Sequence, residues 1–175
     1  GDVETAYAWH ADLDIEIASG WGRRQSLTTF RHRFEALLAS PPAEHRIFGI
    51  VVGGALIGRI DLSLVDAEHR HAALGFFLGA REFRGRGHAK TAVRIMLDYA
   101  FTVENLERVY AHVYGFNARS IGLMKSAGFV AEGVLRQHEV HNGRRQDMHV
   151  FGMLKPEFYA RHRTLFEPPA DLLAP

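Results

Sequence analysis

An apolar run that leads directly into a glycine- and arginine-rich turn restricts the fold more than any other feature of this chain. Residues 72–78 are almost wholly apolar, which is typical of a strand in the centre of a sheet with both faces covered. Residues 80–88 contain two glycines and three arginines. Apolar residues then recur on one helix face, at Ala89, Val93, Met96, Leu97, Ala100 and Phe101. The junction therefore predicts a central strand, a tight turn and a long amphipathic helix.

Two β-hairpins are predicted, one before and one after this unit. Their turns, Gly53-Gly54 and Asn142-Gly143, are residue pairs that tolerate the positive φ angles of two-residue hairpin turns. The β-rich runs that flank these turns are residues 47–52 and 55–62 in the first hairpin, and residues 129–140 and 145–154 in the second.

The remaining segments predict one further strand and several helices. A strand is expected over residues 108–114 and a short helix over residues 117–127, with Asn117 as N-cap and Gly128 after its end. Helices are also expected in two other places, after Ser26 up to Pro41-Pro42 and from Pro156 to about Phe166. Together these elements predict an α+β domain, a mixed α/β sandwich with helices on both sides of one sheet.

The composition excludes several classes of protein and of site. A chain of 175 residues is expected to form one domain. It has no cysteine, which excludes a disulfide scaffold and a cysteine nucleophile and is compatible with a reducing cytoplasm. A net charge of +1 does not fit a strongly basic nucleic-acid binder, and no apolar run is long enough for a membrane-spanning helix. None of the 11 histidines has the spacing of a recognised metal site, so no metal is expected.

Three blocks resemble the GNAT superfamily, the acetyl-CoA-dependent N-acetyltransferases. The segment Arg84-Gly85-Arg86-Gly87-His88-Ala89 is similar to the family's Arg/Gln-x-x-Gly-x-Gly/Ala signature. Residues 117–120 and 125–133 are similar to a second region, in which an asparagine precedes Gly-Phe and Glu-Gly. The similarity covers about residues 45–158. It is closest to the branch of the ribosomal-protein alanine N-acetyltransferases, with the spermidine acetyltransferases nearby.

The resemblance implies a mostly antiparallel central sheet that is flanked by helices and splayed between its two central strands. It implies one domain over residues 1–166, with residues 167–175 as a loose tail. The family's first strand has no clear counterpart, so we expect a shortened or divergent N-terminus. A cytoplasmic protein without a nucleic-acid or membrane partner is expected, and a homodimer is a candidate assembly.

The resemblance also implies where acetyl-CoA would bind. Backbone groups of Phe76, Phe77 and Leu78 would pair with the pantetheine arm, and Asn117 would hydrogen-bond to it. The pyrophosphate would bind to the turn and to the positive end of the following helix. The turn residues concerned are Arg84, Gly85, Arg86, Gly87, His88 and Ala89. Candidate phosphate partners, each with a solvated surface charge as its alternative role, are Lys90, Arg119 and Lys125.

The resemblance implies a proton donor and a base. Many members use a tyrosine seven residues after the asparagine that corresponds to Asn117. This chain has Met124 there, which cannot donate a proton. In the ribosomal-protein branch, a serine at the position of Ser120 donates to the leaving thiolate, and a glutamate at the position of Glu139 is the base. Asp147 is an alternative base, and the N–H of Leu78 is the implied oxyanion donor. Helix capping by Ser120 and a surface ion pair of Glu139 are the structural alternatives.

The implied function is transfer of acetyl to a primary amine by direct attack in a ternary complex, with a protein N-terminus as candidate acceptor. The alternatives are a small-molecule N-acetyltransferase acting on a polyamine or an antibiotic, and a non-catalytic acyl-CoA-binding domain, which the methionine at 124 favours. Trp9 and Trp21 are expected to cover the acceptor side, and His138 or His141 to line the acceptor pocket.

Overall fold

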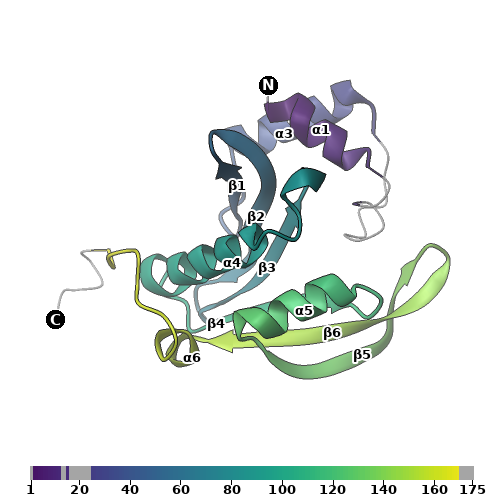
Figure 1. Ribbon diagram of the computed structural model, residues 1–175. Helices are drawn as coiled ribbons and strands as arrows, with labels where there is room; N and C mark the ends of the chain where they lie inside the picture. The colour runs from purple at the N-terminus through teal and green to yellow at the C-terminus, as the bar shows by residue number, and fades with distance from the viewer. Residues whose placement is uncertain (1, 13–14, 16–24, 170–175) are drawn as a thin grey trace.

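The computed structural model describes residues 2–12, 15 and 25–169 (Figure 1). Within these residues, six strands form one sheet in the order β1-β2-β3-β4-β6-β5. The strands are β1 (Arg46–Val52), β2 (Ala55–Asp66), β3 (His71–Leu78), β4 (Arg108–Tyr114), β5 (Val130–His141) and β6 (Arg144–Leu154). The helices are α1 (Asp2–His10), α3 (Leu27–Ala39), α4 (His88–Asp98), α5 (Ala118–Ala127) and α6 (Lys155–Tyr159). None of the described helices is long and apolar enough to cross a membrane.

The two central strands, β3 and β4, are joined along only part of their length. They are parallel to each other, whereas every other neighbouring pair in the sheet is antiparallel. Their pairing runs over residues 71–73 of β3 and 108–110 of β4. Beyond these residues the strands diverge, and Figure 1 shows the sheet opening into two halves. The predicted fold class, a mostly antiparallel sheet flanked by helices, is confirmed.

Helix α4 and its extension bury the core that the sequence periodicity predicts. A single π-helical turn, Tyr99–Val103, continues α4. Of the six apolar positions predicted on this face, only Ala89 at the start of the helix is not fully buried. The five buried positions are Val93, Met96, Leu97, Ala100 and Phe101. This face packs against the sheet and fixes the turn that precedes α4.

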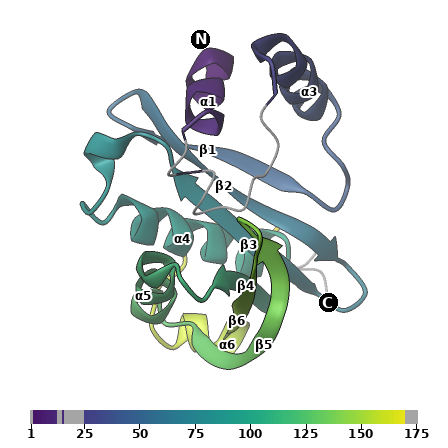
Figure 2. The ribbon, with the colours of Figure 1, turned by 90° about the vertical axis from the view of Figure 1, so that its right-hand side faces the viewer.

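Helices α1 and α3 lie on the opposite side of β1–β3 from α4 (Figure 2). They contact each other through the rings of Tyr7 and Phe30, whose centroids are 5.5 Å apart, and through the ion pair of Arg31 with Glu4. No residue within α1 or α3 is fully buried. This layer therefore rests on the sheet through side chains that remain partly exposed.

The local turn and cap predictions are confirmed where they rest on short-range chemistry. The side chain of Ser26 accepts a hydrogen bond from the N–H of Thr29 and caps α3. The side chain of Asn117 accepts one from the N–H of Ser120 and caps α5, which ends at Gly128 with a φ of 96°. Both predicted hairpins form around their predicted turns.

The predicted C-terminal helix is shorter than expected, because α6 ends at Tyr159 and not near Phe166. The N–H groups of residues 160–162 still bond back to carbonyl oxygens of α6, and the chain around and beyond them makes tertiary contacts. The guanidinium of Arg161 donates to the carbonyl oxygen of Gly128, and the N–H of Leu165 donates to the fully buried Asp98. The prediction was wrong here because these contacts are distant in sequence.

Candidate active site

A cavity of about 1040 Å³ lies where β3 and β4 separate. Its walls are the end of β3, the turn before α4 with the first residues of that helix, and one face of α5. The residues that line it are Ile15, Phe76, Phe77, Leu78, Arg84, Gly85, Gly87, His88, Ala89, Lys90, Asn117, Arg119, Gly122, Leu123 and Ser126. Nearly all of the predicted cofactor-binding positions, from β3, the turn and the cap of α5, thus meet around one space.

The turn before α4 directs backbone N–H groups to this cavity. Gly85 and Gly87 have φ angles of 75° and 85°, which side-chain-bearing residues rarely adopt. Because α4 begins at His88, the N–H groups of His88, Ala89 and Lys90 have no partner inside the helix. The first turn of α4 contains no acidic residue. This combination is typical of an anion-binding helix N-terminus.

Arg84 holds the turn against the end of β3. Its Nε donates to the carbonyl oxygen of Leu78 and its second terminal nitrogen to that of Gly79, both at 3.1 Å. Its positive charge therefore lies at the cavity wall in a fixed position. Lys90 and Arg119 add two further cations, and no carboxylate is among the described lining residues.

Two predicted cofactor residues, Arg86 and Lys125, are not among the lining residues. The guanidinium carbon of Arg86 lies 5.9 Å from the ring centroid of Phe83, and Lys125 is exposed on α5. Ser126, which the sequence analysis did not single out, lines the cavity next to Lys125.

The predicted proton donor, Ser120, lies in the first turn of α5 and is half-buried. It is not among the residues that line the cavity, although Asn117 and Arg119 beside it are. Met124, one helical turn later, is fully buried in the core. The side chain at position 124 therefore packs against the sheet.

Glu139 on β5 is hydrogen-bonded to a residue that the sequence analysis missed. Tyr114, the last residue of β4, donates its hydroxyl proton to Oε2 of Glu139 at 2.6 Å. Burial, and then this bond to Glu139, raise the pKa of Tyr114 to about 12. The phenol therefore stays protonated at neutral pH and fixes the carboxylate. The rings of Phe116 and His141 pack on Tyr114, with centroids 5.1 and 5.3 Å away.

The strand register relates Tyr114 to the cavity. Ala73 of β3 pairs with Tyr110 of β4, and Phe77 and Tyr114 each follow four residues later on their strands. Residues an even number apart on a strand point to the same face. Tyr114 is therefore level with Phe77 on the far side of the splay. The only sequence signal for it is its place at the end of a predicted strand.

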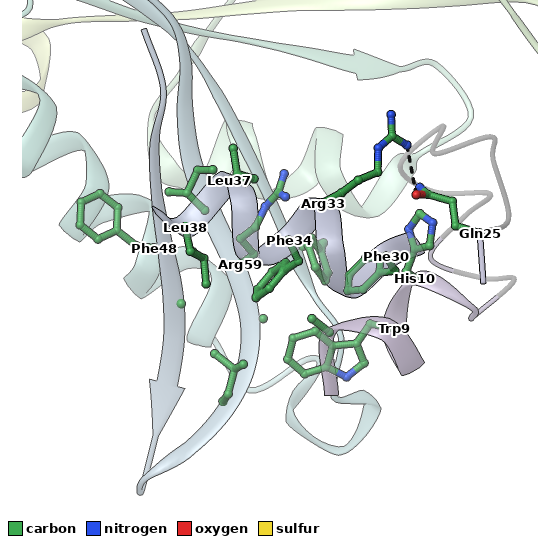
Figure 3. Close-up of a pocket in the computed structure, with 16 residues that line it drawn as sticks. Trp9, His10, Gln25, Phe30, Arg33, Phe34, Leu37, Leu38, Phe48 and Arg59 are labelled. Atoms are coloured by element: carbon green, nitrogen blue, oxygen red, sulfur yellow. Dashed lines mark hydrogen bonds between the residues drawn. The ribbon is translucent and has the colours of Figure 1, made fainter. Parts of the chain in front are cut away.

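A second cavity, of about 380 Å³, lies beneath α1 and α3 and shares Phe77 with the first (Figure 3). Its walls are mainly apolar and aromatic, and Trp9 contacts the ring of Phe77 edge-on at a centroid distance of 5.8 Å. The polar side chains among its described lining residues are His10, Gln25, Arg33 and Arg59. Trp21, which was expected to cover this side with Trp9, lies outside the described residues.

A buried carboxylate holds Arg59 at the floor of the second cavity. Asp61 is 5 % exposed and accepts a 3.0 Å contact from Arg59, while Nε2 of His45 lies 3.1 Å from its other oxygen. A Cβ on the facing Gly75 would lie 3.0 Å from Asp61, so a glycine leaves room for this carboxylate. The guanidinium carbon of Arg59 lies 5.9 Å from the ring centroid of Phe77.

The histidines form no metal centre in the part of the chain that the structure describes, where no three His, Cys, Asp or Glu side chains are grouped to hold an ion. His138 is exposed on β5. His141 belongs to the aromatic cluster around Tyr114. The polar side chains among the described residues that line the two cavities carry guanidinium, ammonium, imidazole, amide and hydroxyl groups.

Comparison with known proteins gives a family match. The model of an acetyltransferase (GNAT) domain matches residues 1–130 of this chain. The chain is 40 % identical over 103 residues to the uncharacterized N-acetyltransferase p20 of Bacillus licheniformis, a match that covers 59 % of this chain and 57 % of that protein. It is 36 % identical over 106 residues to the spermidine N(1)-acetyltransferase of Vibrio cholerae, covering 61 % of each chain. The chain thus spans about three fifths of the length of these two relatives.

The fold is likewise similar to solved structures. A crystal structure of spermidine N-acetyltransferase from Vibrio cholerae in complex with CoA and spermine matches with a TM-score of 0.80 at 27 % identity. The match covers 91 % of this chain and 93 % of that chain.

Proposed function

The chain belongs to the acetyltransferase (GNAT) domain family, and we propose that it transfers the acetyl group of acetyl-CoA to a primary amine. The observation that carries the proposal is the cavity at the splay, where a strand edge, a cationic turn and the capped start of α5 meet. The similar Vibrio cholerae enzyme was crystallised with CoA and spermine, which supports the same kind of ligand here.

The residues of this cavity fit the parts of CoA. Within the described residues, β4 supplies no hydrogen-bond partner to β3 beyond Ala73, so the edge of β3 from Phe76 to Leu78 suits the amides of a pantetheine arm. The N–H groups at the start of α4, with Arg84, suit the pyrophosphate. The cavity has a volume of about 1040 Å³, which is at the upper end of the range for small-molecule and cofactor sites.

Other cations are proposed to contribute to phosphate binding from the rim. Lys90 and Arg119 line the cavity directly. Arg86 and Lys125 lie next to lining residues, so we propose them as outer partners. All of these are single charges near the surface, and each is expected to contribute less than the backbone of the turn.

The proposed reaction forms one bond, breaks one bond and moves one proton at each end. Acetyl-CoA supplies the thioester, whose carbonyl carbon forms a bond to the amine nitrogen while its carbon–sulfur bond breaks. The neutral amine gives up one proton and the leaving thiolate takes one, which yields an acetylated amine and the thiol of CoA. We propose Glu139 as the acceptor of the amine proton and Ser120 as the donor to the thiolate. The N–H of Leu78 would donate to the thioester carbonyl oxygen.

Tyr114 supports the assignment of Glu139. Its hydroxyl donates to Oε2 of Glu139, which leaves Oε1 available for an amine proton or a bridging water. The pair lies at the end of β4, and the carbonyl oxygen of Tyr114 also accepts a hydrogen bond from the N–H of Asn117, which lines the cavity. These two hydrogen bonds support the proposal that Glu139 acts at the acyl end of the CoA site.

Two kinds of acceptor have separate support. A protein N-terminus, as in the ribosomal-protein branch, is supported by the spacing of Ser120 and Glu139. A small-molecule amine is supported by the spermidine acetyltransferase relatives and by a second cavity that meets the first at Phe77. We favour the small-molecule acceptor because residues of α1, α3 and the sheet surround this cavity on several sides.

The proposal is tested with purified protein, acetyl-CoA and a panel of amines that includes polyamines, antibiotics and N-terminal peptides. We expect release of CoA thiol that depends on the amine, and a product one acetyl group heavier by mass spectrometry. Binding of acetyl-CoA without turnover of any amine would instead support a non-catalytic acyl-CoA-binding domain. Absence of both binding and turnover would refute the proposal.

The catalytic assignment is tested separately by the double variant Ser120→Ala with Glu139→Gln. Turnover should fall while the affinity for acetyl-CoA stays unchanged. Ser126→Ala is the matched control, since this serine lines the cavity but its hydroxyl donates to the carbonyl oxygen of Leu123. Unchanged turnover in the double variant would show that other groups move the protons.

A further inference from the structure

The second cavity differs in charge from what a polyamine would require. A polyamine carries several ammonium groups and is bound by carboxylates. None of the described residues that line this cavity is acidic, and two of them, Arg33 and Arg59, carry guanidinium groups. A second or third ammonium group in the cavity would therefore meet positive charge. The spermidine-like acceptor of the similar Vibrio cholerae enzyme does not fit this chemistry.

The walls of the cavity favour a ring or an aliphatic body. Trp9 and Phe30 come from α1 and the start of α3, and Phe34 follows on the next turn of α3 (Figure 3). The rings of Phe30 and Phe34 stack with centroids 5.6 Å apart. With Phe77 below them, these rings enclose an apolar space of about 380 Å³, the size of a small aromatic ligand.

The two guanidinium groups come from different elements around this cavity, Arg59 from the sheet and Arg33 from α3, where the Arg33 side chain is exposed. Arg59 extends from β2 and is held in place by the buried Asp61. Arg33 extends from α3 and donates to Oε1 of Gln25 at 3.0 Å (Figure 3). No carboxylate of the described residues pairs with Arg33, so its charge can be matched by a ligand.

We propose that this cavity binds the acceptor, and that the acceptor is a small amine with an aromatic or aliphatic body and a carboxylate at the end away from the amine. The amine would lie at Phe77, where the two cavities meet. The body would pack between Trp9 and Phe34, and the carboxylate would face Arg33. The inference rests on the proposed acetyltransferase function and names the substrate class of that site.

Three phenyl-bearing amines of similar size test the proposal. They are 4-(2-aminoethyl)benzoic acid, 2-phenylethylamine and 4-(aminomethyl)benzylamine, which carry a negative, no and a positive charge at the far end. We expect kcat/KM to be about tenfold higher for the carboxylate amine than for the neutral one, and lowest for the diamine. Spermidine, tested in parallel, should behave like the diamine.

The variant Arg33→Gln should lower kcat/KM for the carboxylate amine much more than for 2-phenylethylamine, and so abolish the preference between them. Arg33→Lys keeps the charge and should retain most of the preference. Arg94→Gln is the matched control, because Arg94 is exposed on α4 and lines neither cavity. Titration of the carboxylate amine into the CoA-bound protein gives a second readout, and Arg33→Gln should weaken this binding as well.

The outcomes separate this proposal from the proposed function. Higher kcat/KM for spermidine or the diamine, or a carboxylate preference that survives Arg33→Gln, would overturn the acceptor class while leaving the acetyltransferase intact. Binding of acetyl-CoA with neither binding nor turnover of the carboxylate amine would overturn it too. Absence of acetyl-CoA binding and of turnover with every amine would refute the function on which it rests.

Discussion

The two helical layers of this molecule are built differently. On one side of the sheet, α4 buries Val93, Met96 and Leu97, and α5 buries Met124 and Ala127. On the other side, neither α1 nor α3 buries any of its residues fully. The first layer positions the turn and the helix starts that form the proposed CoA site. The second leaves a cavity between itself and the sheet.

Because of this difference, the core fixes one part of the site, and the residues of another part can vary. A change in the residues of α4 that face the sheet also disturbs the fold, because that face is packed on the core. A change in the residues of α1 or α3 alters a partly exposed surface at a smaller cost in stability. The proposed donor site is thus tied to the fold, whereas the side of the proposed acceptor site formed by α1 and α3 is less so.

The two helical layers should differ most in how much a substitution in each lowers the free energy of unfolding. Phe101→Ala, in the fully buried extension of α4, should lower the free energy of unfolding by about 3–5 kcal/mol. Phe34→Ala, on the half-buried face of α3, should lower it by only about 1 kcal/mol. Urea denaturation measures both, and equal losses would mean that the two layers are packed alike.

The next effect concerns catalysis. Glu139→Gln should lower kcat by about a hundredfold because the amide cannot accept the amine proton. Tyr114→Phe should lower it less, by about tenfold, because the carboxylate is retained but no longer held by the phenol. Steady-state kinetics at saturating acetyl-CoA measure both. A larger loss in Tyr114→Phe than in Glu139→Gln would make the phenol itself the reacting group.

A smaller effect is expected on acetyl-CoA binding alone, from a substitution in the turn before α4. Gly87→Ala places a side chain at a φ of 85° with no atom within 4 Å of the new Cβ, so backbone strain of about 1–2 kcal/mol is its only direct cost. If the turn relaxes, the Kd of acetyl-CoA should rise about tenfold, while KM for the amine stays unchanged. Gly53→Ala is the matched control, with a φ of 58° and open space in the β1–β2 turn. It should carry similar strain and leave acetyl-CoA binding intact.

The smallest effect is a pH dependence of stability at alkaline pH. Burial and hydrogen bonds to Glu104 and Glu139 raise the pKa values of Tyr99 and Tyr114 to about 12 from 10.0. Between these values the unfolded chain loses tyrosine protons that the folded chain keeps, so stability falls as pH rises. Tyr99→Phe and Tyr114→Phe should each make this fall shallower in urea titrations at pH 9 to 12. An unchanged slope in both variants would contradict the raised pKa values.

The parts of the fold that depend on local chemistry could be predicted from the sequence. The glycine pairs, the caps at Ser26 and Asn117 and the apolar face of α4 each act within a few residues. Sequence alone also places the β3–turn–α4 unit, because its strand is a continuous apolar run and its helix has a clear apolar periodicity.

The parts that depend on register could not be predicted in the same way. The contact of Tyr114 with Glu139 joins residues 25 apart, and that of His45 with Asp61 requires the register of β1 against β2. The chain after α6 contacts Gly128 and Asp98, which are far away in the sequence. The acceptor cavity needs α1 and α3 to be placed over the sheet, and no short pattern specifies that placement.

The central claim is that CoA binds at the splay between β3 and β4 and not beneath α1 and α3. Amide hydrogen exchange with and without CoA, resolved by residue, tests it most directly. We expect added protection at residues 76–78 of β3 and 87–90 at the start of α4, with little change in α3. Two results would contradict this claim. One is protection confined to α3 and to the residues of α1 that line the second cavity, and the other is no added protection at residues 76–78 and 87–90.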